Sequence, residues 1–234
     1  MRKLLFILLF CALPAFAFWG EHGPGIIDNV PAAPGQGPTL YLTLDACGSV
    51  RDGYDKELVD FLVHNEIPAT LFINARWIDN HQDEFAALAR NPLFKIANHG
   101  TEHKPASVQG LFVYGIEGAS SAAELRAEVV ANADKIERLT GVRPMWYRSG
   151  TAYYDDLAIR EISKMGFKIA GFAITADQGA TLKASAVRSA AMQAKPGDII
   201  LAHMNKPEGE TFEGLAPALS ALKKAGFSFA VLPD

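Results

Sequence analysis

Apolar, β-prone runs alternate with amphipathic stretches along the chain from residue 39 to its end. We expect strands at 40–44, 69–73, 94–97, 145–148, 167–173, 199–203 and 227–232, and helices at 54–65, 77–90, 121–140, 155–165 and 215–225. Repeated strand–helix units predict a parallel sheet of the α/β class. About seven such units in a single domain favour a closed (β/α) barrel over an open doubly wound sheet.

Two segments precede this predicted domain, which covers residues 39–234. Residues 1–17 combine a positive start, an apolar run and the small-x-small pattern Ala15-Phe16-Ala17, and so predict a cleaved signal peptide. The apolar run is shorter than the ~20 residues that span a bilayer, which disfavours an uncleaved anchor. Residues 18–38 are rich in glycine and proline and predict an extended leader. We expect an exported protein, periplasmic or extracellular, with no membrane attachment after cleavage.

Net charge limits the classes of binding partner, and the cysteine count limits the disulfides that the chain can form. The formal net charge is -4, and removal of Arg2 and Lys3 with the signal peptide makes it about -6. This negative net charge argues against a basic surface that binds nucleic acid or an anionic membrane. Neutral or cationic glycans remain plausible partners. Cys47 is the only cysteine beyond the signal peptide, so no internal disulfide is expected. Its thiol could be a nucleophile, a soft metal ligand or a small core side chain.

Polar side chains stand at the carboxyl ends of the predicted strands. Asp45, His99, Arg148, Asp177 and His203 each end or follow an apolar run. The carboxyl ends of parallel strands form one rim, where active sites lie, so we expect these side chains to meet. The local alternatives are a turn-capping aspartate at 45, a structural ion pair between Arg148 and Asp177, and a buried histidine at 203.

His99 and His103 are the candidate metal ligands. Their i, i+4 spacing on one helical turn would aim both imidazoles the same way and let them bind one divalent ion. The alternative is a pair of loop histidines with local hydrogen bonds. His203 is the candidate general acid.

Motifs in this order resemble those of the polysaccharide deacetylases, carbohydrate esterase family four, from Thr39 to Leu232. They are Thr43-Leu44-Asp45-Ala46-Cys47, Asn98-His99-Gly100-Thr101-Glu102-His103, Tyr147-Arg148-Ser149-Gly150, Asp177 and Leu201-Ala202-His203. The resemblance implies a distorted (β/α) barrel and one divalent metal ion, zinc ahead of cobalt, nickel or manganese. It also implies hydrolysis of N-acetyl groups on an N-acetylated glycan.

The resemblance assigns roles to these residues as well. His99 and His103 would bind the metal, a carboxylate would accept the proton of the attacking water, and His203 would protonate the departing amine. Arg148 would orient the base, and Asp177 would hold the acid histidine.

Position 46 departs from the family pattern, because Ala46 stands where the family has a second, metal-binding aspartate. Asp45 could bind the metal while Glu102 or Asp52 acts as the base. Alternatively, Asp45 could remain the base while water completes the coordination of the metal.

The wall that faces the substrate should also differ, because Gly150 replaces a usual proline and Gly100 a usual hydroxyl residue. Aromatic side chains after one strand are suited to stacking on sugars, although core packing explains at least half of them. These are Trp146, Tyr147, Tyr153 and Tyr154.

Three functions fit these observations. The first is a metal-dependent hydrolase that removes N-acetyl groups from a polysaccharide or a peptidoglycan-type glycan. The second, suggested by Ala46, is a non-catalytic glycan-binding or assembly protein on a deacetylase scaffold. The third is a hydrolase of O-acetyl esters or small amides, because the same chemistry attacks any activated carbonyl.

Overall fold

The structure is a computed structural model, and it describes residues 18–31, 35 and 37–234. The predicted signal peptide, residues 1–17, lies outside the described residues. The strands are β1 (Trp19–Gly20), β2 (Ile26–Ile27), β3 (Thr39–Ala46), β4 (Ala69–Ile73), β5 (Phe94–Asn98), β6 (Phe112–Val113), β7 (Ile116–Glu117), β8 (Trp146–Tyr147), β9 (Tyr154–Asp155), β10 (Lys168–Ala170), β11 (Ile174–Thr175), β12 (Ile199–His203) and β13 (Ser228–Phe229). The helices are α1 (Lys56–His64), α2 (Ala75–Asn80), α3 (Gln82–Arg90), α4 (Ala122–Thr140), α5 (Asp156–Lys164), α6 (Ala184–Ala191) and α7 (Thr211–Lys224).

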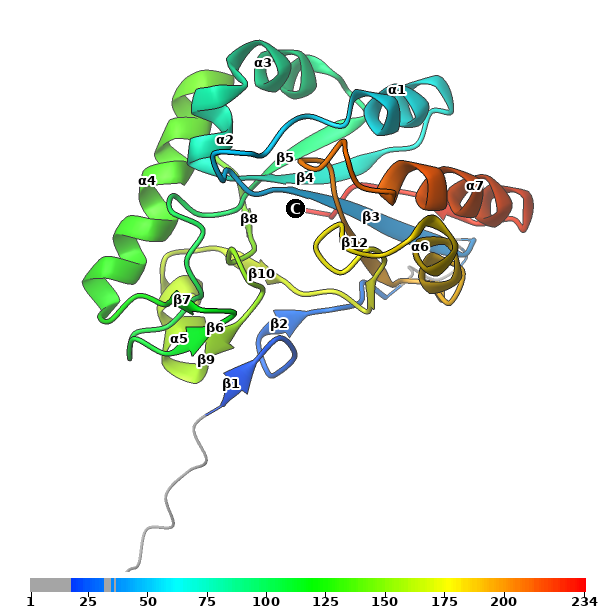
Figure 1. The fold of residues 1–234 in the computed structure, drawn as a ribbon. Coiled ribbons are helices and arrows are strands. Elements are labelled where there is room, and N and C mark those ends of the chain that lie inside the picture. The colour runs from blue at the N-terminus through cyan, green and yellow to red at the C-terminus, as the bar shows by residue number, and fades with distance from the viewer. Residues whose placement is uncertain (1–17, 32–34, 36) are drawn as a thin grey trace, which may run out of the picture.

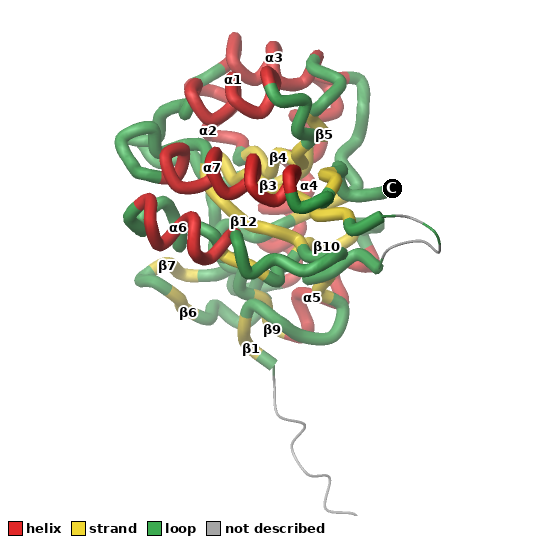
Figure 2. Tube along the Cα trace, turned by 90° about the vertical axis from the view of Figure 1, so that its right-hand side faces the viewer, coloured by secondary structure: helices red, strands yellow, loops and turns green. Residues whose placement is uncertain are grey.

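The main sheet is a curled half-barrel. Strands follow one another in the order β11-β12-β3-β4-β5-β8-β10-β2, and β13 pairs with the beginning of β3. All neighbours in this series are parallel. The helices lie on the outer side of the curl (Figures 1 and 2). The predicted α/β, distorted-barrel fold is confirmed. Strand β2 was not predicted from the sequence pattern, and the apolar run that precedes Asp177 forms two short strands, β10 and β11.

Alternate residues of β3 face opposite sides of the sheet. One set packs into the main core beneath α1 and α7: Leu40, Leu42, Leu44 and Ala46. The other set faces the inside of the curl: Tyr41, Thr43 and Asp45. The Asp45 carboxylate therefore reaches the interior of the half-barrel, whereas the Ala46 side chain lies in the helix-covered core.

The leader segment belongs in part to the sheet. Strand β1 pairs with β9 in antiparallel fashion, and β2 pairs with β10 in parallel. Beyond β2, the Asp28 carbonyl accepts a hydrogen bond from Ile199 N at 3.1 Å, and Val30 N donates to Gly197 O at 2.8 Å. The leader is extended, as predicted, but it crosses from the β10 edge to the start of β12, so the folded domain includes residues before Thr39.

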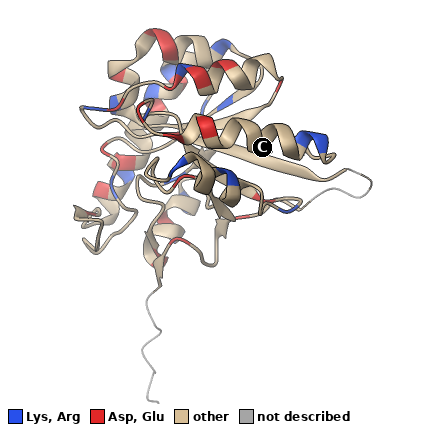
Figure 3. Ribbon diagram, turned by 45° about the vertical axis from the view of Figure 1, so that its right-hand side comes forward, with Lys and Arg blue, Asp and Glu red and all other residues tan. Residues whose placement is uncertain are grey.

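Acidic and basic positions are intermixed along the outer helices (Figure 3). Among the described residues, none of the helices combines the length and the apolar character needed to cross a membrane.

The inside of the curl holds a fully buried arginine, Arg148, directly after β8. Its Nη1 donates to Asp45 Oδ1 at 2.7 Å and to Thr43 Oγ1 at 2.9 Å. Its Nε and Nη2 donate to the carbonyls of Ala170 and Gly171 at 3.3 and 2.8 Å. One guanidinium group thus ties β3, β8 and the end of β10 together.

The ion pair determines the charge state of Asp45. Burial alone would raise the pKa of this carboxyl, but Arg148, followed by the nearby histidines, outweighs burial and lowers the pKa below its usual value. A carboxyl whose pKa is lower in the folded state stabilises the fold at neutral pH. This contribution is lost as the pH falls through the folded-state pKa.

We expect Asp45→Ala to lower the free energy of unfolding by about 3–5 kcal/mol, because it leaves the Arg148 charge buried without its partner. Chemical denaturation of the purified protein at neutral pH measures this loss. Because the two side chains are coupled, the double variant Asp45→Ala, Arg148→Met should lose less than the sum of the two single losses. Additive losses would show that the ion pair does not hold the two strands together.

Candidate metal centre and active site

The predicted residues meet at the carboxyl ends of the strands. A cavity of about 810 Å³ opens there, and its lining includes Asp45, Cys47, His103 and His203. His99 lies buried beside Asp45, with 3.6 Å between His99 Nε2 and Asp45 Oδ2. Side chains from strands far apart in the sequence therefore share one site, as their strand-end positions predicted.

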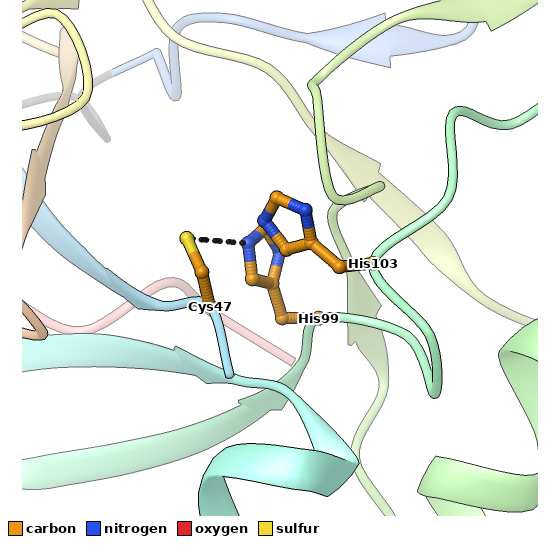
Figure 4. A group of neighbouring side chains, drawn as sticks. All are labelled: Cys47, His99 and His103. Carbon is orange, nitrogen blue, oxygen red and sulfur yellow. Dashed lines mark hydrogen bonds between the residues drawn. The ribbon is translucent and has the colours of Figure 1, made fainter. Parts of the chain in front are cut away.

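Three side chains converge as a candidate metal centre: Cys47, His99 and His103 (Figure 4). Their ligand atoms all lie within 4.8 Å of one another. The Cys47 Sγ atom is 3.8 Å from His99 Nε2, and the two imidazole rings meet edge to face with centroids 4.9 Å apart. One thiolate and two imidazoles form a donor set that suits a zinc-type ion.

Hydrogen bonding prepares His99 for a cation. His99 Nδ1 lies 3.0 Å from the Arg148 carbonyl, which can only accept, so Nδ1 carries the proton and Nε2 faces Cys47. Burial acts to lower the pKa of His99, but the Asp45 charge outweighs it and raises that pKa. The same negative charge favours a metal ion at Nε2.

The two other donors also fit a metal ion. His103 Nε2 is buried and has no hydrogen-bond partner among the described residues. Burial would raise the pKa of the Cys47 thiol, but His103, together with the other two histidines, lowers it well below its usual value. A thiolate and an unpartnered imidazole nitrogen are ligand atoms that a divalent ion would satisfy.

A shaped loop after β5, and not a helical turn, brings the two histidines together. His103 has a φ of 63°, in the left-handed region. The Glu128 carboxylate on α4 accepts hydrogen bonds from Glu102 N at 2.8 Å and from Lys104 N at 3.2 Å. Asn74, after β4, donates from Nδ2 to the carbonyls of His99 and the next residue at 3.0 and 2.9 Å. The two histidines predicted from the i, i+4 spacing do meet, but the helical turn expected between them is not formed.

The glycines that depart from the family pattern are explained by close contacts in this loop. A Cβ atom at Gly100 would lie 2.3 Å from Glu128 Oε1, and a Cβ atom at Gly150 would lie 2.4 Å from the His103 backbone. A side chain at Gly150 would displace the backbone of the histidine loop, and one at Gly100 would displace the Glu128 carboxylate that holds this loop.

His203 and Asp177 form a second hydrogen-bonded pair in the site, with His203 on the strand β12 next to Asp45. His203 Nδ1 donates to Asp177 Oδ1 at 2.8 Å, and His203 N donates to Asp177 Oδ2 at 2.8 Å. Thr211 Oγ1 also donates to Asp177 at 2.9 Å. Burial opposes protonation of His203, but the Asp177 charge outweighs burial and raises the pKa of His203 well above its usual value. A protonated, oriented imidazole is suited to donate a proton.

The two other carboxylates considered as the general base, Asp52 and Glu102, already have partners. Both Asp52 oxygens are occupied, because they accept hydrogen bonds from the backbone and hydroxyl of Ser49 and pair with Lys206 Nζ at 2.6 Å. Glu102 is exposed and pairs with Lys104 at 3.3 Å. Asp45, whose Oδ2 is not bound by Arg148, remains the carboxylate best placed to act as a base.

The local alternatives for the other residues are resolved by these contacts. Arg148 pairs with Asp45 and not with Asp177, so the structural ion pair between Arg148 and Asp177 does not form.

Of the aromatic cluster, three side chains are buried in the core and only Tyr153 is half-buried. The buried ones are Trp146, Tyr147 and Tyr154.

Glu128 and Asn74 were not singled out by the sequence analysis. The signal for Glu128 was present, since it lies on the buried face of α4 with Leu125, Val129 and Asn132. A carboxylate on the apolar face of an amphipathic helix needs hydrogen-bond partners. The histidine loop supplies them.

Comparison with known proteins agrees with this geometry. The sequence profile of the polysaccharide deacetylase family matches residues 32–170. An uncharacterized 30.6 kDa protein of Geobacillus stearothermophilus is 22% identical over 200 residues, which cover 83% of this chain and 69% of that protein.

Solved structures share the fold at low identity. A family 4 carbohydrate esterase pseudoenzyme from Bacillus anthracis superposes with a TM-score of 0.69 at 17% identity, and covers 86% of this chain. The chain spans about two thirds (65%) of the length of that pseudoenzyme. A peptidoglycan N-acetylglucosamine deacetylase gives a TM-score of 0.72 at 18% identity, with 89% of this chain and 90% of that one covered. With the profile match over more than half of its length, the chain belongs to the polysaccharide deacetylase family.

Proposed function

We propose that this chain is an exported, metal-dependent hydrolase that removes N-acetyl groups from a polysaccharide or a peptidoglycan-type glycan. The observation that carries the proposal is the shared cavity. It brings together a metal donor group, a carboxylate held by a buried arginine and a histidine held by a buried aspartate. The presequence pattern supports export to the periplasm or the cell exterior.

In this proposal Cys47, His99 and His103 hold one divalent ion, and Cys47 supplies the ligand that Ala46 cannot. Sulfur and imidazole donors favour zinc, with cobalt or nickel as substitutes, over manganese. When bound, such an ion acidifies water and polarises an amide carbonyl. This assignment frees Asp45 from the alternative role of metal ligand.

The chain's own residues carry the proton transfers. The Oδ2 atom of Asp45 accepts a proton from the attacking water, while Arg148 fixes the carboxylate through Oδ1. His203, whose Nδ1 is bound to Asp177, offers Nε2 to the departing amine. A base and an acid whose pKa values are shifted in opposite directions match the two proton transfers of amide hydrolysis.

A non-catalytic glycan-binding protein is the second candidate. It is favoured by Ala46 and by the similarity to the Bacillus anthracis pseudoenzyme, of which a mutant is described as having restored enzymatic activity. Its cavity would bind the glycan without turnover. The third candidate, an O-acetyl esterase, would cleave an ester bond, whereas the deacetylase would cleave an amide bond and the binding protein would cleave neither.

We expect the mature parent protein to retain about one zinc ion per chain, and Cys47→Ser to weaken zinc binding by more than the 10–100-fold typical of outer-shell changes. The cobalt-loaded parent should show a thiolate-to-cobalt charge-transfer absorption in the near ultraviolet, which Cys47→Ser should abolish. Asp45→Asn is the matched control: it removes a nearby charge and not a ligand, so it should lose far less zinc affinity than Cys47→Ser and should keep the absorption. Loss of metal in Asp45→Asn together with its retention in Cys47→Ser would reverse the two assignments.

The zinc-loaded parent should release acetate from N-acetylglucosamine oligomers or peptidoglycan, with O-acetylated xylan tested in parallel. We expect His203→Ala to slow turnover by about 10²–10⁴-fold without loss of zinc, because it removes the general acid. His64→Ala, on the exposed face of α1, is the control and should match the parent. A zinc-loaded parent that releases no acetate from any of these substrates would favour the binding protein.

Restoring a carboxylate at position 46 should not restore the family's metal ligand. We expect Ala46→Asp to destabilise the fold by about 2–4 kcal/mol, because the new carboxylate would be buried among core leucines. Cys47→Asp, by contrast, should keep a metal site. Thermal denaturation with and without zinc measures both effects, and zinc-dependent stabilisation of Ala46→Asp beyond that of the parent would contradict the placement of residue 46.

A further inference from the structure

The hairpin β6–β7 has an unusual residue at its tip. Tyr114 and Gly115 form a two-residue turn, and both have positive φ values, 53° and 75°. This turn type is normally built from asparagine or aspartate followed by glycine, because an ordinary side chain is strained at positive φ. A tyrosine here works against the local stability of the hairpin.

Tyr114 is exposed, yet it faces the site. Its side chain is 71% exposed, and it lines the same cavity as Cys47 and His103. Phe112 in the same hairpin is 62% exposed but does not line the cavity. The two exposed aromatic side chains of the hairpin therefore differ in their relation to the site.

Tyr114 is the outermost member of a row of aromatic rings. Its ring meets Tyr153 nearly at a right angle with centroids 5.7 Å apart, and Tyr153 lies 5.4 Å from the Trp19 ring. The members of the row come from the hairpin, the loop after β8 and the leader strand β1. Because the leader carries Trp19, its pairing with β9 places this ring against Tyr153, which in turn packs against Tyr114.

A carboxyl group accompanies the row. Glu21, next to β1, also lines the cavity, and burial raises its pKa. Burial and the Glu21 charge raise the pKa of Tyr114 to about 12, which keeps the phenol neutral. Aromatic faces with adjacent hydroxyl and carboxyl groups match a sugar ring, which has apolar C–H faces and hydroxyls around its edge.

We infer that Tyr114, supported by the rings of Tyr153 and Trp19, forms a subsite that binds a neighbouring sugar unit of the glycan, beyond the unit held next to Cys47, His99 and His103. The inference rests on the proposed function. Tyr114 lines the same cavity as Cys47 and His103, so a glycan chain bound next to the metal donor group can reach Tyr114. Tyrosine is unfavourable in this turn, and a role in ligand binding explains why it is present there.

The decisive variant is Tyr114→Asn, since asparagine suits positive φ and removes only the ring. Phe112→Thr is the matched control, because it removes an exposed aromatic ring from the same hairpin but outside the cavity. Both are introduced into zinc-loaded His203→Ala protein, in which turnover is suppressed. Calorimetry then measures the binding of single N-acetylglucosamine, of its longer linear oligomers and of soluble peptidoglycan strands.

We expect Tyr114→Asn to weaken binding of the longer glycans by about tenfold, equivalent to about 1.4 kcal/mol. Binding of the single sugar should not change, and the melting temperature should equal or exceed that of the parent. Phe112→Thr should bind all probes as the parent does. Equal weakening for the single sugar and the oligomers would overturn the subsite, because it would indicate a disturbed site near the metal donors.

Failure of the subsite and failure of the proposed function give different results. If the parent binds or deacetylates the oligomers and Tyr114→Asn does so equally well, the subsite is overturned and the function stands. If the parent neither binds nor deacetylates any N-acetylated glycan probe, the proposed function falls, and the subsite with it.

Discussion

The buried guanidinium of Arg148 is the interaction on which the site depends. Its planar fork donates to a carboxylate, a hydroxyl and two carbonyls in different directions, which a lysine ammonium could not match. Its own carbonyl accepts the Nδ1 proton of His99. One residue therefore orients the candidate base through its side chain and the candidate ligand through its backbone. Because an unpaired buried charge is costly, Asp45 has to stay ionised, which is also the state that a base requires.

The loops that carry the candidate metal ligands are held by polar residues that are not themselves part of the donor group. Glu128 and Asn74 bind the backbone of the histidine loop, and Asp52 binds the backbone amides of Gly48 and Ser49, directly after Cys47. These contacts span the loops after β3, β4 and β5. Loops fixed by such bonds keep the donor atoms close in the absence of a ligand, as a preorganised site requires.

The sequence predicted the parts of the site that follow from strand geometry. Asp45 and His203 end neighbouring parallel strands, and the paired register of Asp45 with His203 shows why their positions at strand ends were sufficient to bring them together. The histidine pair was found from its spacing together with its position at the end of a strand, although a left-handed residue and not a helical turn lies within the loop that brings the two rings together. The local sequence pattern therefore identified the residues of the site but did not predict the conformation of the backbone that joins them.

Contacts between segments that are distant in the sequence could not be predicted from the pattern of hydrophobic and polar residues. The loop carbonyls and amides that Glu128 and Asn74 bind carry no sequence signal, and strands of two residues, such as β2, have no detectable period. The aromatic row illustrates the same limit. The cluster near Tyr153 was noticed because its members are adjacent in sequence, but most of them are core residues, whereas Tyr114 and Trp19 come from remote segments and meet only in the fold.

The exchange of a carboxylate for a thiol follows from the length of β3. The strand remains paired through Ala46, which lies opposite Ile73, so the alternation of side chains directs residue 46 into the helix-covered core. Residue 47 is the first beyond the strand, and its side chain turns toward His99. A ligand at 47 is therefore compatible with this backbone, whereas a ligand at 46 would require the strand to end earlier. In the proposed metal centre, a thiolate at 47 in place of the family's aspartate would make the donor set softer, which would disfavour manganese.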